Sequence, residues 1–186
     1  MNPRTRVKVC GITTPEDAQM AAALGVDAIG LVFHPPSPRQ VDLDAARAIT
    51  AALPPFVSCV ALFVDAAPEL IRTVLDAVPI DCIQFHGQET PADCAYWGRR
   101  FIKALRMQPG LDVAAEAERY RAASGLLLDT WVPGVPGGTG QTFDWGRVPR
   151  DCVLPLVLAG GLTPDNVATA IAAARPHAVD VSGGVE

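Results

Sequence analysis

The sequence contains no hydrophobic run long enough to cross a bilayer and no block of basic residues. Its apolar stretches are broken by proline, glycine or charge before the ~20 residues that a membrane span requires. Acidic residues number 20 against 15 lysines and arginines, so the net charge is −5 at pH 7. Proteins that bind nucleic acid usually carry a basic stripe. We therefore expect neither a membrane nor a nucleic acid as a partner.

The sequence also lacks paired cysteine motifs and an apolar N-terminal segment. Its five cysteines are an odd number and form no C-x-x-C pair. This pattern argues against a disulfide framework and against a zinc site. Residues 1–4 carry no apolar region of the kind found in a secretory signal. These absences predict a cytoplasmic protein that holds no metal.

What is present is enough apolar sequence to form a packed core. Hydrophobic residues make up 49% of the 186 positions and charged residues 19%, which excludes an intrinsically disordered chain. At about 150 residues per domain, this length predicts one domain over residues 1–186. No linker or low-complexity segment divides the chain. We expect a single domain that acts on a small molecule.

Short β-rich runs alternate with helical stretches along the whole chain. The runs are apolar without clean alternation, which is typical of parallel strands buried on both faces. Strands are expected at Val7–Cys10, Ala28–Phe33, Ser58–Val64, Cys82–Phe85, Phe101–Ala104, Leu126–Asp129, Leu156–Ala159 and Ala178–Val181. Helices are expected at Ala18–Leu24, Ala45–Leu53, Pro68–Val78, Ala92–Trp97, Val113–Ala123 and Asn166–Ala174, with a short helical piece after Phe143–Trp145. Capping signals for these helices are Thr14, Asp42, Thr90 and Thr163.

Eight strands in continuous βα alternation predict an α/β fold of the (β/α)8 TIM-barrel type. The alternative is an open doubly wound sheet, but no G-x-G-x-x-G motif follows the first strand. Barrels of this kind average ~250 residues, whereas this sequence ends at Glu186, directly after the eighth expected strand. We therefore expect a barrel without its final C-terminal helix, either as a monomer of low stability or as a homodimer.

Two glycine-rich turns follow the seventh and eighth expected strands, at Gly160-Gly161 and Ser182–Gly184. Barrel enzymes place their chemistry at the carboxyl ends of the strands, and the last two loops are their usual phosphate site. Backbone N–H groups of such turns form a concavity of the size of an anion. Glycine also simply allows a strand to exit tightly, but its presence at both strands favours a phosphate site.

Two strand ends carry groups that can transfer protons. Asp129 follows three leucines, and partial desolvation suits it to a general-acid role, although Asp also serves as a loop hydrogen-bond acceptor. Cys10 ends the first strand beside Gly11. As a base it would have to be a thiolate near a positive charge, whereas most cysteines pack as small hydrophobes. The residues alone leave both choices open.

Arg39, His86 and a glycine-rich segment complete the candidates. Arg39 lies in a proline-stiffened loop and could hold a carboxylate through two hydrogen bonds, or be solvated. His86 could act as an acid or base, or as a structural donor. Residues 134–142 are interpreted as a loop over the mouth of the barrel that contacts a ligand, or as a plain connector.

Several motifs occur in the order found in one enzyme family. They are Lys8-Val9-Cys10-Gly11-Ile12-Thr13, Ser37-Pro38-Arg39, Gln84-Phe85-His86-Gly87, Leu127-Leu128-Asp129, Gly137-Gly138-Thr139-Gly140 with Phe143-Asp144-Trp145, Leu158-Ala159-Gly160-Gly161-Leu162, and Asp180-Val181-Ser182. Over residues 8–186 the chain resembles phosphoribosylanthranilate isomerase, a (β/α)8 enzyme of tryptophan biosynthesis.

The resemblance implies a cofactor-independent Amadori rearrangement, the third step of tryptophan biosynthesis from chorismate. N-(5-phosphoribosyl)anthranilate would become 1-(2-carboxyphenylamino)-1-deoxyribulose 5-phosphate. Asp129 would protonate the ribose ring oxygen and Cys10 would remove the C2 proton, the two facing each other across the mouth. The substrate would be held by Arg39 at its carboxylate, by Gly160, Gly161, Ser182 and Gly183 at its phosphate, and by His86 and Gly138. The family usually has serine where this chain has Gly183.

Three other functions are alternatives to the one that this resemblance implies. Indole-glycerol-phosphate synthase would need a cluster of catalytic lysines, and the sequence has only Lys8 and Lys103. A histidine-pathway isomerase would have aspartate where this chain has Cys10. A non-catalytic barrel that binds a phosphorylated ligand would bind without turnover.

Overall fold

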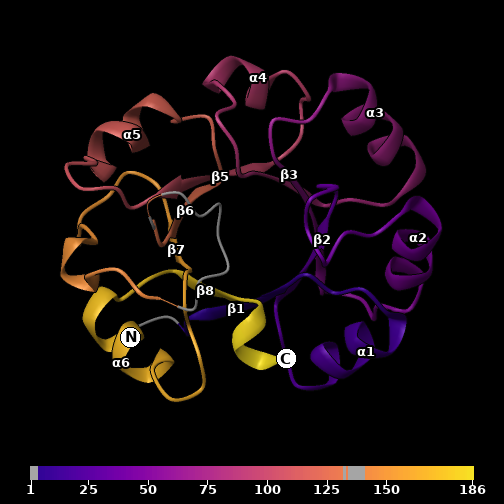
Figure 1. Cartoon of the computed structure of the whole chain (residues 1–186), viewed down its shortest axis with the longest axis horizontal. Coiled ribbons are helices and arrows are strands. Elements are labelled where there is room, and N and C mark those ends of the chain that lie inside the picture. Colours follow the sequence, from indigo (N-terminus) through magenta and orange to yellow (C-terminus); the bar gives the residue numbers. More distant parts are fainter. Residues whose placement is uncertain (1–3, 132, 134–140) are drawn as a thin grey trace. The chain divides into compact units, whose positions relative to one another are not determined.

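The computed structural model describes residues 4–131, 133 and 141–186 (Figure 1). Eight parallel strands follow one another in the order β1 to β8 in a closed barrel, which confirms the expected TIM-barrel fold. The strands are β1 (Arg6–Cys10), β2 (Ala28–Val32), β3 (Ser58–Phe63), β4 (Cys82–Phe85), β5 (Phe101–Arg106), β6 (Gly125–Asp129), β7 (Leu156–Leu158) and β8 (Ala178–Val181).

The helices also lie where the sequence predicted them, within a few residues at each end. They are α1 (Pro15–Ala23), α2 (Leu43–Ala51), α3 (Pro68–Ala77), α4 (Pro91–Ala95), α5 (Val113–Arg119) and α6 (Val167–Ala174), with the 3-10 helices η1 (Trp145–Arg147) and η2 (Gly183–Val185). In the described part of the chain, β8 is followed only by η2. None of the described helices is long and apolar enough to cross a membrane.

Three of the four predicted helix caps are confirmed and one is wrong. The side chains of Thr14, Asp42 and Thr90 accept backbone N–H groups at the starts of α1, α2 and α4. Thr163 does not cap α6 with its side chain. Instead Asn166 precedes α6, and its Oδ1 accepts the Thr163 N–H at 2.9 Å. The Asn166 side chain therefore accepts a backbone N–H group in the turn where the Thr163 side chain was expected to do so.

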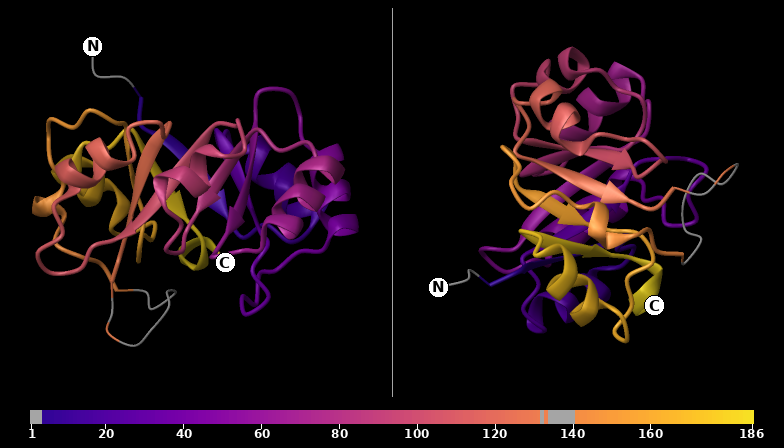
Figure 2. Two further views of the ribbon diagram at one scale, coloured as in Figure 1. Left: turned by 90° about the horizontal axis from the view of Figure 1, so that it is seen from above. Right: turned by 90° about the vertical axis from the view of Figure 1, so that its left-hand side faces the viewer.

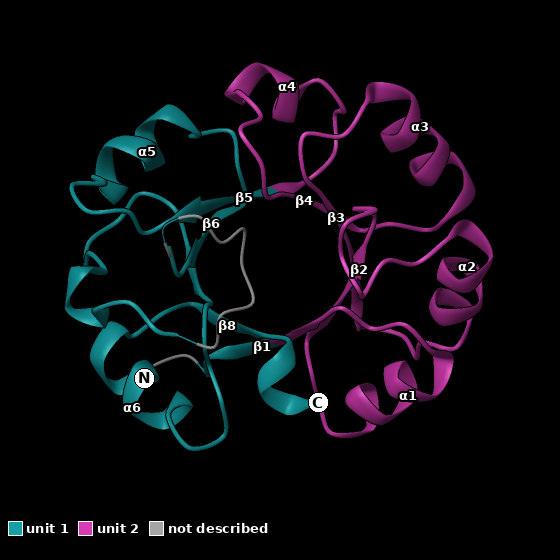
Figure 3. Ribbon diagram, in the orientation of Figure 1, with its two compact units in different colours: residues 1–7, 102–186 teal, residues 8–101 magenta. Residues whose placement is uncertain are grey.

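The chain divides into two compact units (Figure 3), and the boundaries fall within β1 and β5. Unit 2 comprises Lys8–Phe101 and therefore holds β2, β3 and β4 with α1 to α4. Its strands pair in parallel, and its helices lie on the outer side of the strands (Figure 2). The largest buried side chains of this unit include Phe63, Phe85, Ile29 and Leu31.

Unit 1 comprises Met1–Val7 and Ile102–Glu186 and holds β6, β7 and β8 with α5 and α6. One cluster of buried small and aliphatic side chains comes from four of its strands: Ala104, Leu127, Val157, Ala159 and Ala178. β5 runs two residues further than expected, because Leu105 and Arg106 pair with Leu128 and Asp129 of β6. This pairing fixes the end of β6, where a candidate acid lies.

Candidate active site

Cys10 lies at the end of β1 in a space kept open by a glycine on the neighbouring strand. Cys10 is 9% exposed and pairs with Gly30 of β2. A Cβ atom added to Gly30 would lie 2.6 Å from Cys10 Sγ and 3.0 Å from Lys8 Nζ. The chain then turns through Gly11, whose φ of +87° favours glycine and whose N–H donates to the Gly30 carbonyl at 2.9 Å. The thiol and the lysine amine thus both lie against the Gly30 backbone.

Lys8 was counted in the sequence but not recognised as a member of this site. It is only 5% exposed, and its two-residue spacing from Cys10 on β1 puts both side chains on one face of the strand. A protonated lysine supplies the positive charge that stabilises a thiolate. Lys8 and Cys10 are two residues apart, so the sequence predicts that they lie on the same face of the strand. The sequence does not say whether that face points into the barrel or towards the helices.

The other buried cysteines lack this environment. Burial and the negative charge of Asp81 raise the pKa of the Cys59 thiol to about 12. Cys94 is the fully buried residue of α4, and its Sγ lies 4.0 Å from the Glu89 carbonyl oxygen. Cys59 and Cys94 therefore pack as small hydrophobic residues, as the sequence suggested.

Arg39 lies in a tight turn after β2. The Arg39 N–H donates to Ser37 Oγ at 3.2 Å, and the Gln40 N–H donates to the Ser37 carbonyl at 3.1 Å. The following residue, Val41, returns to the sheet through its N–H bond to the Val32 carbonyl at 3.1 Å. The turn is therefore anchored on both sides of the half-buried Arg39.

His86 follows β4 and is tied to the strand by its backbone and its ring. Its N–H donates to the Phe63 carbonyl of β3 at 2.8 Å, and its Nδ1 lies 3.1 Å from Nε2 of Gln84. Gln84 is completely buried. Gln84 was quoted only as the first residue of the Gln84-Phe85-His86-Gly87 motif and was not predicted to be a site residue, because glutamine is ordinarily exposed.

In unit 1, Asp129 ends β6 with its carboxylate held near the backbone. Asp129 Oδ1 accepts the Thr130 N–H at 2.9 Å, and the Asp129 carbonyl accepts the Met107 N–H at 2.9 Å. The side chain is half-buried after three fully buried leucines. This places a carboxylate at the carboxyl end of a strand, where barrel enzymes carry their catalytic groups.

The two glycine-rich turns of unit 1 lie against each other. Gly160 and Gly161 have φ angles of +81° and +64°, and a Cβ atom on Gly160 would collide with Thr130. A Cβ atom on Gly184 would collide with the carbonyl oxygen of Leu162. Backbone of the loop after β7 and of the turn after β8 is therefore brought together, as expected of a phosphate site made from both.

The loop after β7 is braced by an amide side chain. Asn166 Nδ2 donates to the Gly161 carbonyl at 2.9 Å while Asn166 Oδ1 accepts the Thr163 N–H. The turn after β8 closes through the Val185 N–H, which donates to the Ser182 carbonyl at 3.1 Å. Gly138, the remaining predicted substrate contact, lies outside the described residues.

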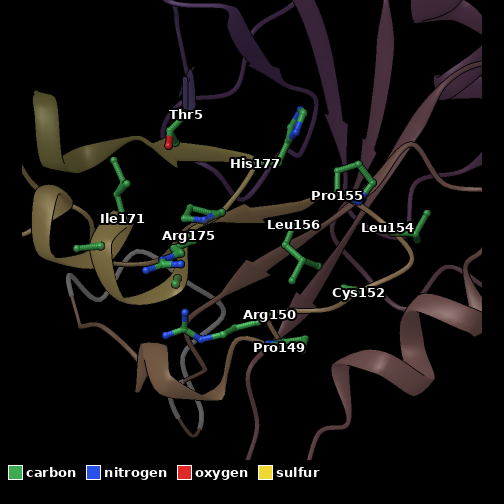
Figure 4. Close-up of a pocket in the computed structure, with 13 residues that line it drawn as sticks. Thr5, Pro149, Arg150, Cys152, Leu154, Pro155, Leu156, Ile171, Arg175 and His177 are labelled. Carbon is green, nitrogen blue, oxygen red and sulfur yellow. The ribbon is translucent and has the colours of Figure 1, made fainter. Parts of the chain in front are cut away.

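A cavity of about 480 Å³ in unit 1 lies away from these strand ends (Figure 4). Its lining includes Leu154 and Leu156 at the start of β7 and His177 just before β8. These are the amino ends of the strands, whereas barrel enzymes act at the carboxyl ends. The cavity is therefore not part of the candidate active site.

Comparisons with known proteins agree with the resemblance noted in the sequence. The family of N-(5'-phosphoribosyl)anthranilate (PRA) isomerases matches residues 7–186. The N-(5'-phosphoribosyl)anthranilate isomerase of Pseudomonas fluorescens is 60% identical over 184 residues, which cover 99% of this chain and 88% of that protein. The enzyme of Azotobacter vinelandii is 61% identical over 181 residues, which cover 97% of this chain and 88% of that protein.

Solved structures lead to the same family. Phosphoribosyl anthranilate isomerase from Thermotoga maritima has a TM-score of 0.89 and 42% identity, covering 98% of this chain and 90% of its own. A phosphoribosyl anthranilate isomerase in complex with reduced 1-(o-carboxyphenylamino)-1-deoxyribulose 5-phosphate has a TM-score of 0.85 and 41% identity, covering 98% and 89%. The chain belongs to the N-(5'-phosphoribosyl)anthranilate isomerase family.

Proposed function

We propose that Cys10 and Asp129 carry out the proton transfers of the isomerisation that this chain catalyses. The reaction is the Amadori rearrangement of N-(5-phosphoribosyl)anthranilate to 1-(2-carboxyphenylamino)-1-deoxyribulose 5-phosphate, in tryptophan biosynthesis. The observation that carries the activity is identity of about three residues in five to N-(5'-phosphoribosyl)anthranilate isomerases over almost the whole chain, 60% over 184 residues in one case. The roles of individual residues are our proposal.

Asp129 acts as the general acid in this scheme. Its carboxyl proton goes to the ribose ring oxygen, the C1–O bond breaks, and the nitrogen lone pair forms a Schiff base at C1. The hydrogen bond from the Thr130 N–H to Asp129 Oδ1 supports this role, because it holds one oxygen in place and so fixes the orientation of the carboxyl group.

Cys10 acts as the general base in the next step. Its thiolate takes the proton from C2, and the C2–H electron pair moves to form the enolamine while the Schiff-base nitrogen becomes neutral. Tautomerisation of the enol to the ketone then gives the product, so the reaction consumes no oxidant or reductant. The position of Lys8 Nζ near the same Gly30 backbone supports the thiolate form.

The remaining candidates bind the substrate. Arg39 holds the anthranilate carboxylate through two parallel hydrogen bonds. Gly160, Gly161, Ser182 and Gly183 hold the phosphate, which the close approach of the two turns supports. His86 and Gly138 contact the rest of the substrate. The isomerisation takes place within one substrate molecule, and the proposed mechanism uses no cofactor.

The ligand class and the setting complete the proposal. The partner is a phosphorylated small molecule, and the chain works as a monomer or a homodimer in the cytoplasm. All five cysteines are free thiols, which supports a reducing compartment.

Turnover by the purified chain tests the proposal directly. We expect N-(5-phosphoribosyl)anthranilate to be converted to the ketose product, measured by chromatography, and the analogue without phosphate to be converted far less efficiently. Binding of the phosphorylated compound without conversion would instead support the non-catalytic barrel.

A further inference from the structure

Gln84 belongs to the same face of unit 2 as the proposed base. In parallel strands, residues paired in register point to the same side of the sheet. Val32 pairs with Leu62, and Leu62 pairs with Gln84. Val32 and Leu62 form one buried cluster with Cys10. Gln84 and, two residues later, His86 therefore extend the row of side chains that begins at Cys10.

The contact between the two side chains links the orientation of the Gln84 amide to the tautomer of His86. Gln84 Nε2 lies 3.1 Å from His86 Nδ1. With the amide in this orientation its nitrogen donates and Nδ1 accepts, whereas the opposite amide orientation would set Oε1 against an Nδ1–H group. In a neutral imidazole with an unprotonated Nδ1, the proton is on Nε2. In the orientation in which the Gln84 amide nitrogen faces the ring, Nε2 of His86 is therefore a hydrogen-bond donor.

The backbone that directly follows His86 is held by two acids. Glu89 is buried, and its carboxylate accepts the Asp65 N–H at 2.8 Å and the Gly87 N–H at 2.9 Å. Asp65 Oδ1 in turn accepts the Gln88 N–H at 2.6 Å. Together with the bond from the His86 N–H to the Phe63 carbonyl, these contacts fix the start of the loop.

Gln84 is an unfavourable choice for the interior unless its amide nitrogen is needed. Its Oε1 is buried and has no hydrogen-bond partner among the described residues. A buried acceptor without a donor destabilises a fold, and an apolar residue of similar size avoids that penalty. The contact of its amide with the His86 ring, at 3.1 Å, is the interaction that offsets this cost.

We propose that Gln84 is a positioning residue that holds His86 as the neutral Nε2–H imidazole, so that Nε2 donates a hydrogen bond to an oxygen of the bound substrate. The inference rests on the proposed function for the identity of the substrate. The orientation of the ring is set by Gln84, and the position of its backbone is set by the clamp of Glu89 and Asp65. A hydrogen bond made equally to the substrate and to the transition state lowers KM and leaves kcat unchanged.

The protonation state is measured on the unmodified chain by ¹⁵N NMR of its histidine rings. The sequence has only three histidines, and a His86→Asn variant identifies the signals of His86. We expect a single neutral tautomer with the proton on Nε2. A proton on Nδ1 in the wild-type chain overturns the proposal, whether or not the chain is active, so this result is separate from a failure of the proposed function.

Substitution of Gln84 distinguishes a role in orienting His86 from a role in the stability of the fold. In Gln84→Leu and Gln84→Met we expect a mixture of both His86 tautomers, a rise in KM of about tenfold and a kcat within about twofold of wild type. We also expect an unchanged or higher Tm, because the unpaired Oε1 is removed. Gln88→Met is the matched control, since Gln88 is exposed and only its backbone joins the clamp. Unchanged KM and tautomer in the Gln84 variants would contradict the proposal, as would a loss of Tm that accounts for the loss of activity.

Discussion

Gly184 lies directly against the backbone carbonyl of Leu162, so that the turn after β8 and the loop after β7 share one packed backbone surface. Any side chain at residue 184 must push these two segments apart. If both segments hold the substrate phosphate, Gly184→Ala should weaken phosphate binding. We expect about a tenfold rise in KM and in the inhibition constant of inorganic phosphate.

Gly110→Ala is the control for this variant. A Cβ atom there meets no atom within 4 Å, although its φ of +81° adds local strain. It should leave KM and phosphate inhibition unchanged. Equal behaviour of the two variants would remove the β7 and β8 turns from the phosphate site.

Gly30→Ala tests whether the space beside Cys10 matters for catalysis. The added Cβ would lie 2.6 Å from Cys10 Sγ, so the thiol or the β2 backbone must move. Misplacement of a catalytic group by about 1 Å can reduce the rate on the order of 10²-fold. We expect such a loss in kcat, measured by steady-state kinetics. Gly25→Ala, where the Cβ meets open space, should keep its kcat.

Arg39→Ala should chiefly weaken binding of the anthranilate carboxylate. Loss of a charge-assisted pair of hydrogen bonds corresponds to roughly a 10- to 100-fold rise in KM. A substrate analogue that lacks the carboxylate supplies the control, because it should bind equally well to wild type and variant. If the variant discriminates between the two compounds as strongly as wild type does, Arg39 has no role in reading the carboxylate.

Cys59 should make the fold less stable in alkaline solution. Its folded pKa is about 12 against an ordinary value of 9.0, so above pH 9 the unfolded chain releases the proton and the folded chain keeps it. The free energy of unfolding therefore falls as pH rises from 9 towards 12, by at most about 1.4 kcal/mol per pH unit.

The comparison of wild type with Cys59→Ala isolates this titration. Denaturant unfolding at about pH 8 and about pH 10 should show a smaller loss of stability in the variant. Identical losses in the two proteins would show that Cys59 ionises alike in the folded and unfolded chains.

The strand pattern was predictable because most strands, such as β2, β3 and β6, are short apolar runs buried on both sides. The run at residues 126–129 is an example: Leu126, Leu127 and Leu128 are fully buried, and the polar Asp129 marks the end of the strand. Helix caps were predictable where the capping side chain precedes the first turn, as at Asp42, and not before α6, where Asn166 reaches back to the Thr163 N–H.

The composition of the site was only partly predictable, because it depends on pairing between strands. The sequence set Cys10 apart from Cys59 by its position at a strand end beside Gly11, but it held no further reason to treat this thiol as a base. The pairing of Cys10 with Gly30 and the position of Lys8 Nζ supply that reason. Gln84 was missed for the same cause, since its row through Leu62 and Val32 exists only once the register is known.

The kcat values of Cys10→Ser and Asp129→Asn test the central claim most directly. If Cys10 is the base and Asp129 the acid, each substitution should lower kcat by roughly 10²–10⁴-fold with a much smaller change in KM. A KM close to that of wild type would show that the variants still fold and bind substrate. A kcat near that of wild type in either variant would contradict the role assigned to that residue.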